Sequence, residues 1–446
     1  MFSFVLFVIV STYVLQYQFS TAAGNNKDCL ILTPYIKAGN ASHARHLSEV
    51  DSGNFLGVNS HSGFLTVKEE YNSNLFFWYF PHENQAEVPW IIWLQGGPGI
   101  SSLFGLFELI GPLKIDDGKV KHRNLTWASD YSLLFVDSPV GAGFSFTDDD
   151  NGYTDNEDDV GAQLYELVIQ LLQMFPELEQ APLFIAGESY AGKYVPALAI
   201  QIHRNQDQND SHPVNLRGIA IGNGIIDPRS MMHYTELLSV LGLLAGKELD
   251  KLKEIEDAAV ALLDEGKMVD AANKFNETIE YIKKQSGISI YNFNKDSGGS
   301  VNSDLELFVT KPEVRSWIHV GSVPFDLNNQ YVYTKMLPDF MNSTKPFIEE
   351  LLEHYGVMCY SGQLDLLLPY GVTKHTHDQF NWSRRSEFDK APRKRLRSSN
   401  KGGIVGYKRS GGNFVEVLIR HAGHMVPIEV PEVAKFIVDS FIMEYK

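Results

Sequence analysis

Seven short apolar runs, separated by helical patterns, constrain the fold of this chain more than any other feature of its sequence. Each run is rich in β-branched and aromatic residues and ends at a glycine-rich or polar turn, which is typical of strands buried on both faces. Because helical patterns alternate with several of these runs, we predict an α/β fold with a mostly parallel central sheet covered on both sides. The predicted strands are Leu75–Phe80, Trp90–Leu94, Leu133–Val136, Leu183–Ala186, Ile219–Ile221, Val357–Tyr360 and Val415–Ile419, and the predicted helices are Val160–Phe175, Ala191–Ile202 and Pro431–Ile442.

In the middle of the chain the strands give way to three consecutive helical patterns, at Met231–Leu244, Lys247–Leu263 and Lys267–Lys284. A polar stretch rich in Gly, Ser and Asn, Asn292–Ser303, follows them and is predicted to be a loop. We therefore predict a helical cap over one end of the sheet, residues 229–304. It would be inserted between a first core segment, residues 24–228, and a second core segment, residues 305–446.

The charge and cysteine content exclude several classes of protein. The 446 residues carry a formal net charge of −17, which argues against a general nucleic-acid binder. Two cysteines are too few for a disulfide framework or a four-thiolate zinc site, and we predict no metal ion and no cofactor. Cys29 and Cys359 could pair in an oxidising lumen, but the apolar surroundings of Cys359 favour a buried thiol. The basic run Arg384–Arg397 is interpreted as a solvated surface loop, with a protease-sensitive loop or a polyanion contact as alternatives.

The N-terminal segment indicates the secretory pathway. Phe2–Leu15 is almost wholly apolar, and the small residues Ser20–Ala23 follow it, as a signal-peptidase site requires. We predict a cleaved signal peptide, residues 1–23, with a retained anchor as the alternative, and no stable membrane insertion of the mature chain. Sequons add support for a secreted or lysosomal/endosomal glycoprotein. The predicted glycosylation sites are Asn40, Asn124, Asn209, Asn276, Asn342 and Asn381.

The stretch Leu183–Gly192, LFIAGESYAG, carries the strongest chemical signal. A strand meets a tight turn at Ser189, and a helix begins immediately afterwards, which is the arrangement of a nucleophile elbow. The usual G-x-S-x-G pattern is imperfect because Ala191 occupies the fifth position, but alanine is small enough for the turn. Taken alone, this stretch could also be a plain turn.

A serine hydroxyl needs a base to accept its proton, and the base needs an orienting carboxylate. In this fold the partners follow the serine in the order Asp, His, on loops after later strands. Asp365 follows the strand Val357–Tyr360, and His424 follows the strand Val415–Ile419. His421 is a competing candidate, but the Gly423–His424 pair places His424 at the loop apex, and we prefer it.

The developing negative oxygen needs backbone N–H donors, that is, an oxyanion hole. We predict one donor at Tyr190, the residue after the serine, and the other at Gly97 in the glycine-rich loop after Trp90–Leu94. A phosphate-binding loop is a weak alternative, because Pro98 has no N–H and no lysine follows at the required spacing. Together these features predict a serine hydrolase.

Several motifs resemble those of the serine carboxypeptidase family, and most closely its vitellogenic carboxypeptidase-like branch. They include WLQGGPG (Trp93–Gly99), DSPVGAGFS (Asp137–Ser145), GESYAGKYVP (Gly187–Pro196), SGQLDLLLP (Ser361–Pro369) and HAGHMVP (His421–Pro427). The resemblance covers nearly the whole mature chain. It implies an α/β-hydrolase fold with a helical cap, and it implies release of single residues from peptide or protein C-termini through an acyl-enzyme.

The resemblance also implies how a free C-terminal carboxylate is recognised. Glu188, Gln95 and the backbone of Gly96 would bind it, with Trp93 shaping the site. Two carboxyl groups at short range must share a proton, which favours acidic pH. Phe104, Phe107, Tyr190 and Met425 would line side-chain pockets, or else pack in the core.

Two departures from the family pattern bear on this site. The family often has asparagine where Gln95 stands. A second family glutamate is matched only by Glu108, one place earlier than expected, so that either a helix slips by one residue or the contact is lost. Among possible assemblies, a homodimer is compatible with the sequence.

Three other functions stay open at this stage. The same scaffold could transfer an acyl group to an alcohol, because an acyl-enzyme accepts other nucleophiles. A general esterase or lipase would leave Glu188 without a role. A non-catalytic protective or carrier protein would have no need of Ser189, Asp365 and His424.

Overall fold

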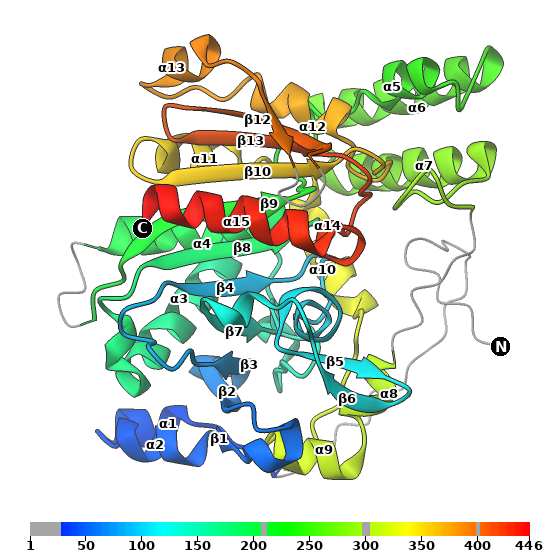
Figure 1. Cartoon of the computed structure of the whole chain (residues 1–446). Helices are drawn as coiled ribbons and strands as arrows, with labels where there is room; N and C mark the ends of the chain where they lie inside the picture. Colours follow the sequence, from blue (N-terminus) through cyan, green and yellow to red (C-terminus); the bar gives the residue numbers. More distant parts are fainter. Residues whose placement is uncertain (1–27, 207–211, 297–303, 398–401) are drawn as a thin grey trace.

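The computed structural model describes residues 28–206, 212–296, 304–397 and 402–446. Its centre is an 11-stranded sheet in the order β1-β2-β3-β7-β4-β8-β9-β10-β13-β12-β11, with a separate hairpin of β5 and β6 (Figure 1). The strands are β1 (Glu49–Val50), β2 (Ser60–Lys68), β3 (Ser73–Phe80), β4 (Trp90–Leu94), β5 (Leu113–Asp116), β6 (Lys119–His122), β7 (Ser132–Val136), β8 (Leu183–Glu188), β9 (Leu216–Gly222), β10 (Gly356–Gly362), β11 (Lys394–Arg397), β12 (Ile404–Gly411) and β13 (Phe414–Ile419).

The middle of the sheet is parallel and both margins are antiparallel. The neighbours β7, β4, β8, β9, β10 and β13 all run in the same direction. At the margins, β2 with β3 and β12 with β13 are antiparallel pairs joined by short turns, as a hairpin connection requires. All seven predicted strands are confirmed, and the prediction of a mostly parallel sheet holds for the core of the sheet.

Helices cover both faces of the sheet (Figure 1). Adjacent residues of one strand point to opposite faces, so Ile185 packs with the cluster that includes α3 and α4, whereas Phe184 packs with the cluster that includes α15. The helices are α1 (Thr33–Lys37), α2 (Ala41–Leu47), α3 (Glu157–Met174), α4 (Ala191–Asn205), α5 (Tyr234–Leu241), α6 (Lys247–Asp264), α7 (Met268–Ser286), α8 (Leu305–Val309), α9 (Pro312–Trp317), α10 (Gln330–Phe340), α11 (Lys345–Leu352), α12 (Tyr370–His377), α13 (Arg385–Lys390), α14 (Val426–Glu429) and α15 (Pro431–Tyr445).

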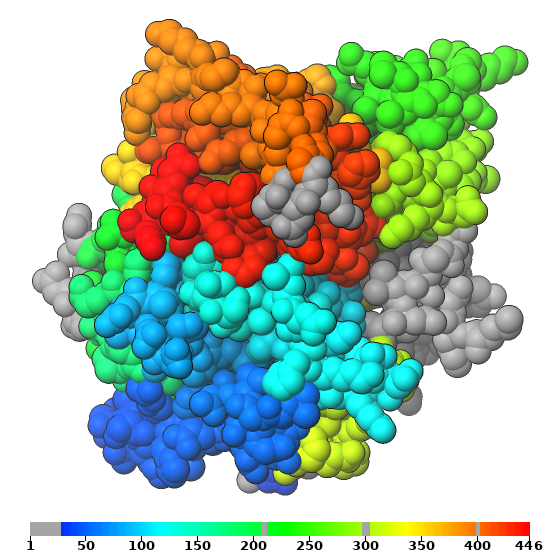
Figure 2. All heavy atoms as spheres, in the orientation of Figure 1, coloured from blue at the N-terminus to red at the C-terminus, as the bar shows by residue number. Residues whose placement is uncertain are grey.

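The three consecutive helices predicted for the middle of the chain are present as α5, α6 and α7. Figure 2 shows α5 and α6, in green, projecting at one corner of the molecule. Helix α7 packs against α6 and also against α10. The limits of the cap at residues 229 and 304 stay a prediction, and residues 297–303 of its closing loop lie outside the described residues.

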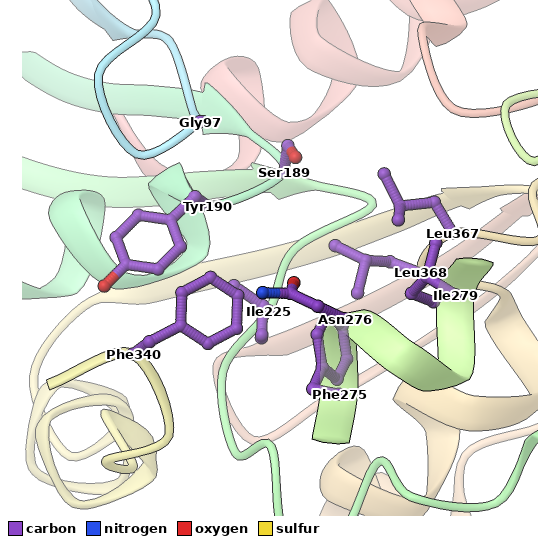
Figure 3. A pocket seen from close by; sticks show the side chains of 10 residues that line it. All are labelled: Gly97, Ser189, Tyr190, Ile225, Phe275, Asn276, Ile279, Phe340, Leu367 and Leu368. Carbon is purple, nitrogen blue, oxygen red and sulfur yellow. The ribbon is translucent and has the colours of Figure 1, made fainter. Parts of the chain in front are cut away.

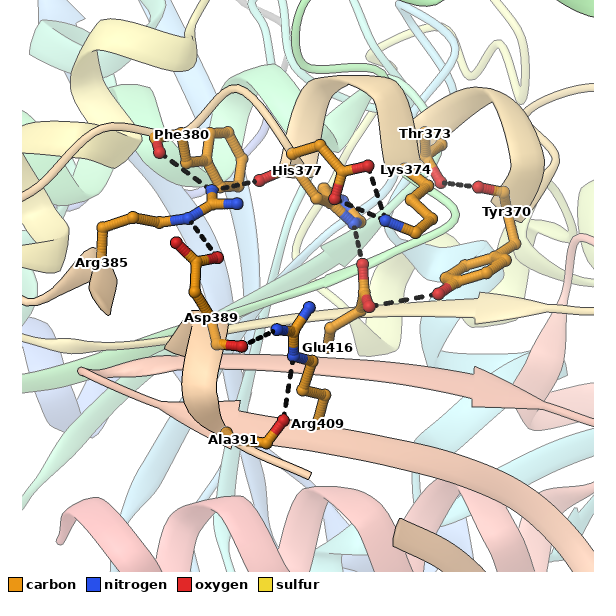
Figure 4. A network of polar contacts seen from close by, with 11 residues as sticks. Tyr370, Thr373, Lys374, His377, Phe380, Arg385, Asp389, Ala391, Arg409 and Glu416 are labelled. Atoms are coloured by element: carbon orange, nitrogen blue, oxygen red, sulfur yellow. Dashed lines mark hydrogen bonds and ion pairs between the residues drawn. The ribbon is translucent and has the colours of Figure 1, made fainter. Parts of the chain in front are cut away.

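The basic run at 384–397 is not a plain loop, which corrects the interpretation from the sequence. It contains α13 and the edge strand β11. The buried ring of Phe388 anchors α13, and Arg385 donates hydrogen bonds to the carbonyls of His377 and Phe380. Figure 4 shows this network beside a buried ion pair of 2.9 Å between His377 on α12 and Glu416 on β13.

Three further predictions concern the N-terminal segment, membrane insertion and the two cysteines. The predicted signal peptide, residues 1–23, lies outside the described residues. Within the ranges that the structure describes, no helix is both long and apolar enough to cross a membrane. Cys359 is buried in β10, and Cys29 and Cys359, which both lie in the described part, are not joined by a disulfide.

Candidate active site

Ser189 stands on the sharp turn between β8 and α4. Its φ of 64° lies in the left-handed region, which is uncommon for a residue other than glycine. The turn is held by a hydrogen bond of 3.0 Å from the Ser189 N–H to the carbonyl of Gly222. A Cβ on Gly187 would lie 2.7 Å from the Cβ of Ala191, so the missing side chain of Gly187 makes room for alanine at the fifth position of the motif.

Asp365 and His424 meet at the carboxyl ends of β10 and β13. The Nδ1 atom of His424 lies 2.8 Å from Oδ2 of Asp365, and both side chains are buried. His421, the competing candidate, is exposed. Asn223, after β9, donates a hydrogen bond of 2.7 Å to the same Asp365 oxygen, and the N–H of Leu367 donates one of 2.8 Å to the other.

Two opposing influences act on the pKa of His424. Burial lowers the pKa, because it disfavours the charged imidazolium. The charge and the hydrogen bond of Asp365 raise it, and the net pKa lies above the ordinary 6.5. The Asp365 carboxylate therefore both orients the imidazole and stabilises its protonated form.

The glycine-rich loop after β4 lies directly against the turn at Ser189. A Cβ on Gly96 would lie 2.6 Å from the Tyr190 nitrogen and 2.8 Å from the Ser189 Cβ, so only glycine allows this approach. Gly97, Ser189 and Tyr190 line one pocket, in which the Gly97 and Tyr190 backbones flank the serine (Figure 3).

Asp137 holds the glycine-rich loop in place and was missed as a site residue in the sequence. Its Oδ1 accepts hydrogen bonds of 2.6 Å from the Ser101 hydroxyl and 2.9 Å from the Ser102 N–H. The Ser102 hydroxyl in turn accepts a bond of 3.0 Å from the Gln95 N–H. Asp137 begins the motif DSPVGAGFS, which could have marked it as a site residue. Its role as hydrogen-bond acceptor could not be read from that motif, because the donors Ser101 and Ser102 lie on a loop distant in sequence.

A buried hydrogen-bonded chain runs from Trp93 through Gln95 to Glu188. Trp93 Nε1 donates to Gln95 Oε1 at 3.0 Å, and Gln95 Nε2 donates to Glu188 Oε1 at 2.9 Å. The other Glu188 oxygen, Oε2, is buried and has no hydrogen-bond partner among the described residues. Burial raises the pKa of Glu188 to about 7, against the opposing charge of His424 and the hydrogen bond from Gln95.

Glu108 lies on a π-helix, Gly105–Ile110. A π-helical turn holds one residue more than an α-helical turn, which corresponds to the one-place offset of this glutamate in the sequence. Glu108 is half-buried, and its charge acts on the half-buried guanidinium of Arg123.

The pocket beside Ser189 is small and mostly apolar. Helix α7 contributes Phe275, Asn276 and Ile279 to it, opposite Ser189 in Figure 3. The remaining lining residues are Gly97, Tyr190, Ile225, Phe340, Leu367 and Leu368.

The other residues predicted for pockets lie elsewhere. Phe107 is fully buried in the core, where its ring contacts those of Trp78 and Phe308. Phe104 and Met425 are half-buried against the same cluster, and their role in a substrate pocket stays a prediction.

The predicted glycosylation sites differ sharply in exposure. The acceptors Asn40, Asn124, Asn342 and Asn381 are exposed, and Asn209 lies outside the described residues. Asn276 is only 7% exposed, and its amide contacts the Tyr333 hydroxyl at 2.7 and 2.9 Å. A glycan on this nitrogen would have to displace the contact with Tyr333, so the burial of Asn276 argues against glycosylation at this site.

The fold and the arrangement of this site define an α/β-hydrolase. The solved structure of Kex1(Δ)p, a prohormone-processing carboxypeptidase from Saccharomyces cerevisiae, superimposes with a TM-score of 0.80. That match covers 90% of this chain and 96% of the yeast chain at 24% identity, and it shows the shared fold.

The chain belongs to the serine carboxypeptidase family, whose sequence model matches residues 51–444. It is 41% identical to the vitellogenic carboxypeptidase of Aedes aegypti, over 94% of this chain and 90% of that protein. It is 38% identical to the probable serine carboxypeptidase CPVL of Homo sapiens, with the same coverage. The venom serine carboxypeptidase of Apis mellifera is 35% identical, over 92% of this chain and 90% of that protein. A Ser-Asp-His mechanism is general for this family.

Proposed function

We propose that this serine carboxypeptidase uses Ser189 as nucleophile, His424 as general base and Asp365 as the residue that orients His424. Release of C-terminal residues is favoured by one observation above all. Glu188, next to Ser189 in the chain, keeps a buried carboxyl oxygen without a partner among the residues described. Such an atom is costly unless a ligand satisfies it, and a substrate carboxylate is a suitable ligand.

The proposed reaction has two halves. The Ser189 oxygen attacks the carbonyl carbon while its proton moves to His424 Nε2, and the N–H groups of Gly97 and Tyr190 stabilise the oxyanion. His424 then donates the proton to the nitrogen of the departing residue, and the acyl-enzyme forms. Water attacks the acyl-enzyme with His424 again as base, which releases the shortened peptide and restores Ser189.

Recognition of the C-terminal carboxylate is assigned to Glu188, Gln95 and the backbone of Gly96, with Trp93 holding Gln95. A protonated Glu188 can donate a hydrogen bond to a carboxylate, whereas an ionised Glu188 repels it. The pKa of about 7 makes the protonated form prevail below neutral pH. The raised pKa of His424 reduces the supply of neutral base as the pH falls further. We therefore expect a weakly acidic optimum on substrates with a free C-terminus.

The pocket at Ser189 is assigned to the side chain that precedes the cleaved bond. Gln95 and Glu188 would hold the departing residue, and neither lines this pocket. The pocket therefore lies on the acyl side of the bond, and its largely apolar lining favours apolar side chains there.

The decisive experiment compares two peptides that differ only in amidation of the C-terminus, assayed with the wild type and with Glu188→Gln. The wild type should release the terminal residue of the free acid and spare the amide. Its kcat/KM on the free acid should fall as the pH rises through about 7. The glutamine side chain of the variant cannot ionise, so this alkaline decline should be absent there. Equal cleavage of both peptides, or cleavage of neither, would contradict the carboxypeptidase assignment.

The buried oxygen of Glu188 without a partner among the described residues does not favour the alternative functions. An esterase or lipase acting on uncharged substrates gains nothing from the buried Glu188 carboxyl group, and neither does a protein that only binds or protects a partner. Acyl transfer to an alcohol uses the same acyl-enzyme, and it would be detected as an ester product when an alcohol is added to the assay.

We also propose that the protein enters the secretory pathway and is secreted or lysosomal. The apolar N-terminal segment supports this localisation, as do the exposed sequons at Asn40, Asn124, Asn342 and Asn381. A homodimer stays a prediction.

A further inference from the structure

A buried group of charged and polar side chains lies directly behind the turn that carries Ser189. Its centre is Lys193 on α4, which is fully buried three residues after Tyr190. Two carboxyl groups act on the Lys193 ammonium, those of Glu157 at the start of α3 and of Asp339 at the end of α10. Glu157 and Asp339 are 4% and 8% exposed, so the three groups share a space that excludes most solvent.

Lys193 connects two parts of the proposed active site. Its ammonium donates a hydrogen bond of 2.7 Å to the backbone carbonyl of Asp339, and it lies 5.4 Å from the centre of the Tyr190 ring. Asp339 directly precedes Phe340, and the rings of Tyr190 and Phe340 lie 5.3 Å apart in the pocket lining. Lys193 therefore ties the end of α10 to the start of α4 without itself lining the pocket.

We propose that Lys193 is a positioning residue for the reaction, which acts through Tyr190 and Phe340 rather than by contact with the substrate. This inference rests on the proposed function, because it takes the Tyr190 N–H as an oxyanion donor and the pocket as the acyl-side subsite. A displacement of about 1 Å at such positions can lower a rate by roughly 100-fold.

The charge balance of the group supports this role. Burial raises the pKa of Glu157 to about 8, and the nearby Lys193 opposes that rise. Below this pH the Glu157 carboxyl is neutral, so the charges of Lys193 and Asp339 can balance. Above it, Glu157 adds a negative charge close to Tyr190, which disfavours an oxyanion bound at the Tyr190 N–H. The titratable and charged groups that face this cluster are Tyr190, Tyr194, Asp158 and Asp227.

The test uses the full-length protein and the double variant Lys193→Met with Asp339→Asn. The single change Lys193→Met would leave the buried Asp339 carboxylate without its cation and could unfold the protein, whereas the double change removes one charge of each sign. The matched control is Lys311→Met. Lys311 also donates to a backbone carbonyl, that of Gly118 at 2.9 Å, and also lies 5.4 Å from a ring centre, that of Phe308, but it is not among the pocket-lining residues.

Two readouts separate positioning from stability. The first is the second-order rate at which a serine-reactive phosphonate labels Ser189, which requires the oxyanion hole but no C-terminal carboxylate. We expect the double variant to be labelled at least ~10-fold more slowly than the wild type. The second is the ratio of kcat/KM for peptides with Phe or Ala before the cleaved bond, which should fall by about 10-fold because Phe340 is no longer held. Lys311→Met should change neither quantity.

The inference would be overturned if the folded double variant kept both the labelling rate and the Phe/Ala ratio of the wild type. It would also be overturned if Lys311→Met changed these two quantities as much as the double variant does. If the wild type did not release a C-terminal residue, the proposed function would be contradicted instead. The comparison of labelling rates would still test the positioning role of Lys193, because labelling needs no C-terminal carboxylate. The single variant Glu157→Gln adds a pH readout. Its labelling rate should stay constant through pH 8, where the wild-type rate declines, and an identical decline in both would also count against the inference.

Discussion

At the scale of single residues, the pKa of His424 depends on a few specific contacts. Burial alone would make His424 a weaker base, and the Asp365 carboxylate reverses that effect. Asp365 is itself held by the Asn223 amide and by the Leu367 N–H. The contacts of Asp365 with His424 and with Asn223 join residues on different loops, so the pKa of His424 depends on the arrangement of the loops as well as on the imidazole.

Replacement of Asp365 by asparagine is therefore expected to lower kcat by about 10⁴-fold, because the imidazole loses both its orientation and the charge that stabilises its protonated form. The acid side of the pH–rate profile should also move to lower pH, since Glu188 and Glu429 alone would then oppose the lowering of the His424 pKa by burial. Steady-state kinetics between pH 4 and pH 8 would measure both effects. Asp378→Asn, which removes an exposed carboxylate paired with Lys374, is the control. A loss of less than about 10-fold in Asp365→Asn would contradict the assigned role.

At the scale of elements, the loop that carries His424 depends on the strand before it. Glu416 on β13 pairs with His377 on α12 at 2.9 Å and accepts a hydrogen bond of 3.1 Å from the Tyr370 hydroxyl (Figure 4). Burial raises the pKa of Glu416, but the bond and the charge of His377 outweigh it, and the net pKa lies below the ordinary 4.5. This buried pair holds α12 against β13, the strand that leads to His424.

Folding lowers the pKa of this carboxyl group, so its ionised form stabilises the folded state at pH values above the pKa of the unfolded chain. This contribution is lost as the pH falls through the pKa of the folded state. Glu416→Gln should therefore lower the free energy of unfolding by roughly 2 kcal/mol near pH 6.5. The difference from the wild type should shrink below about pH 4.5, where the wild-type carboxyl group is also neutralised. Urea unfolding at the two pH values would measure it, with the exposed Glu432→Gln as control. A pH-independent difference would show that the charge of Glu416 is not the cause.

At the scale of the whole molecule, the glycosylation sequon N-x-Ser/Thr occurs both with a buried asparagine and with exposed ones. The Asn276 amide on α7 is buried against Tyr333 of α10, whereas four other acceptors lie on the surface. A glycosylating enzyme needs access to the acceptor nitrogen, and a glycan attached before folding would have to be accommodated inside the pocket beside Ser189.

Peptide mapping by mass spectrometry, on the protein purified from a eukaryotic host, is expected to find glycans at exposed acceptors and an unmodified Asn276. Enzymatic deglycosylation in heavy-oxygen water marks each modified asparagine and makes the comparison quantitative. The exposed acceptors are Asn40, Asn124, Asn342 and Asn381. A glycan at Asn276 in folded, phosphonate-reactive protein would contradict the buried placement.

The predicted elements were those whose pattern is local. Central strands such as Trp90–Leu94 are continuous apolar runs, and α3 has an apolar face that repeats with the helical period. The outer strands β12 and β11 were not predicted, because Ile404–Gly411 and Lys394–Arg397 mix charged, glycine and apolar residues. Strand β12 pairs with β13, and β11 pairs with β12, so each depends on a neighbouring strand that no short window of sequence contains.

The order of the elements, the turn at Ser189 and the places of Asp365 and His424 after their strands could all be predicted from the sequence, because each depends on residues close together in the chain. The neighbours of these residues in space could not be predicted and are known from the fold alone. It placed α7 over Ser189, left one oxygen of Glu188 without a partner among the described residues, and gathered Glu157, Lys193 and Asp339 from three helices. These outcomes depend on packing between distant segments, and the free energy of burial acts only when those segments meet.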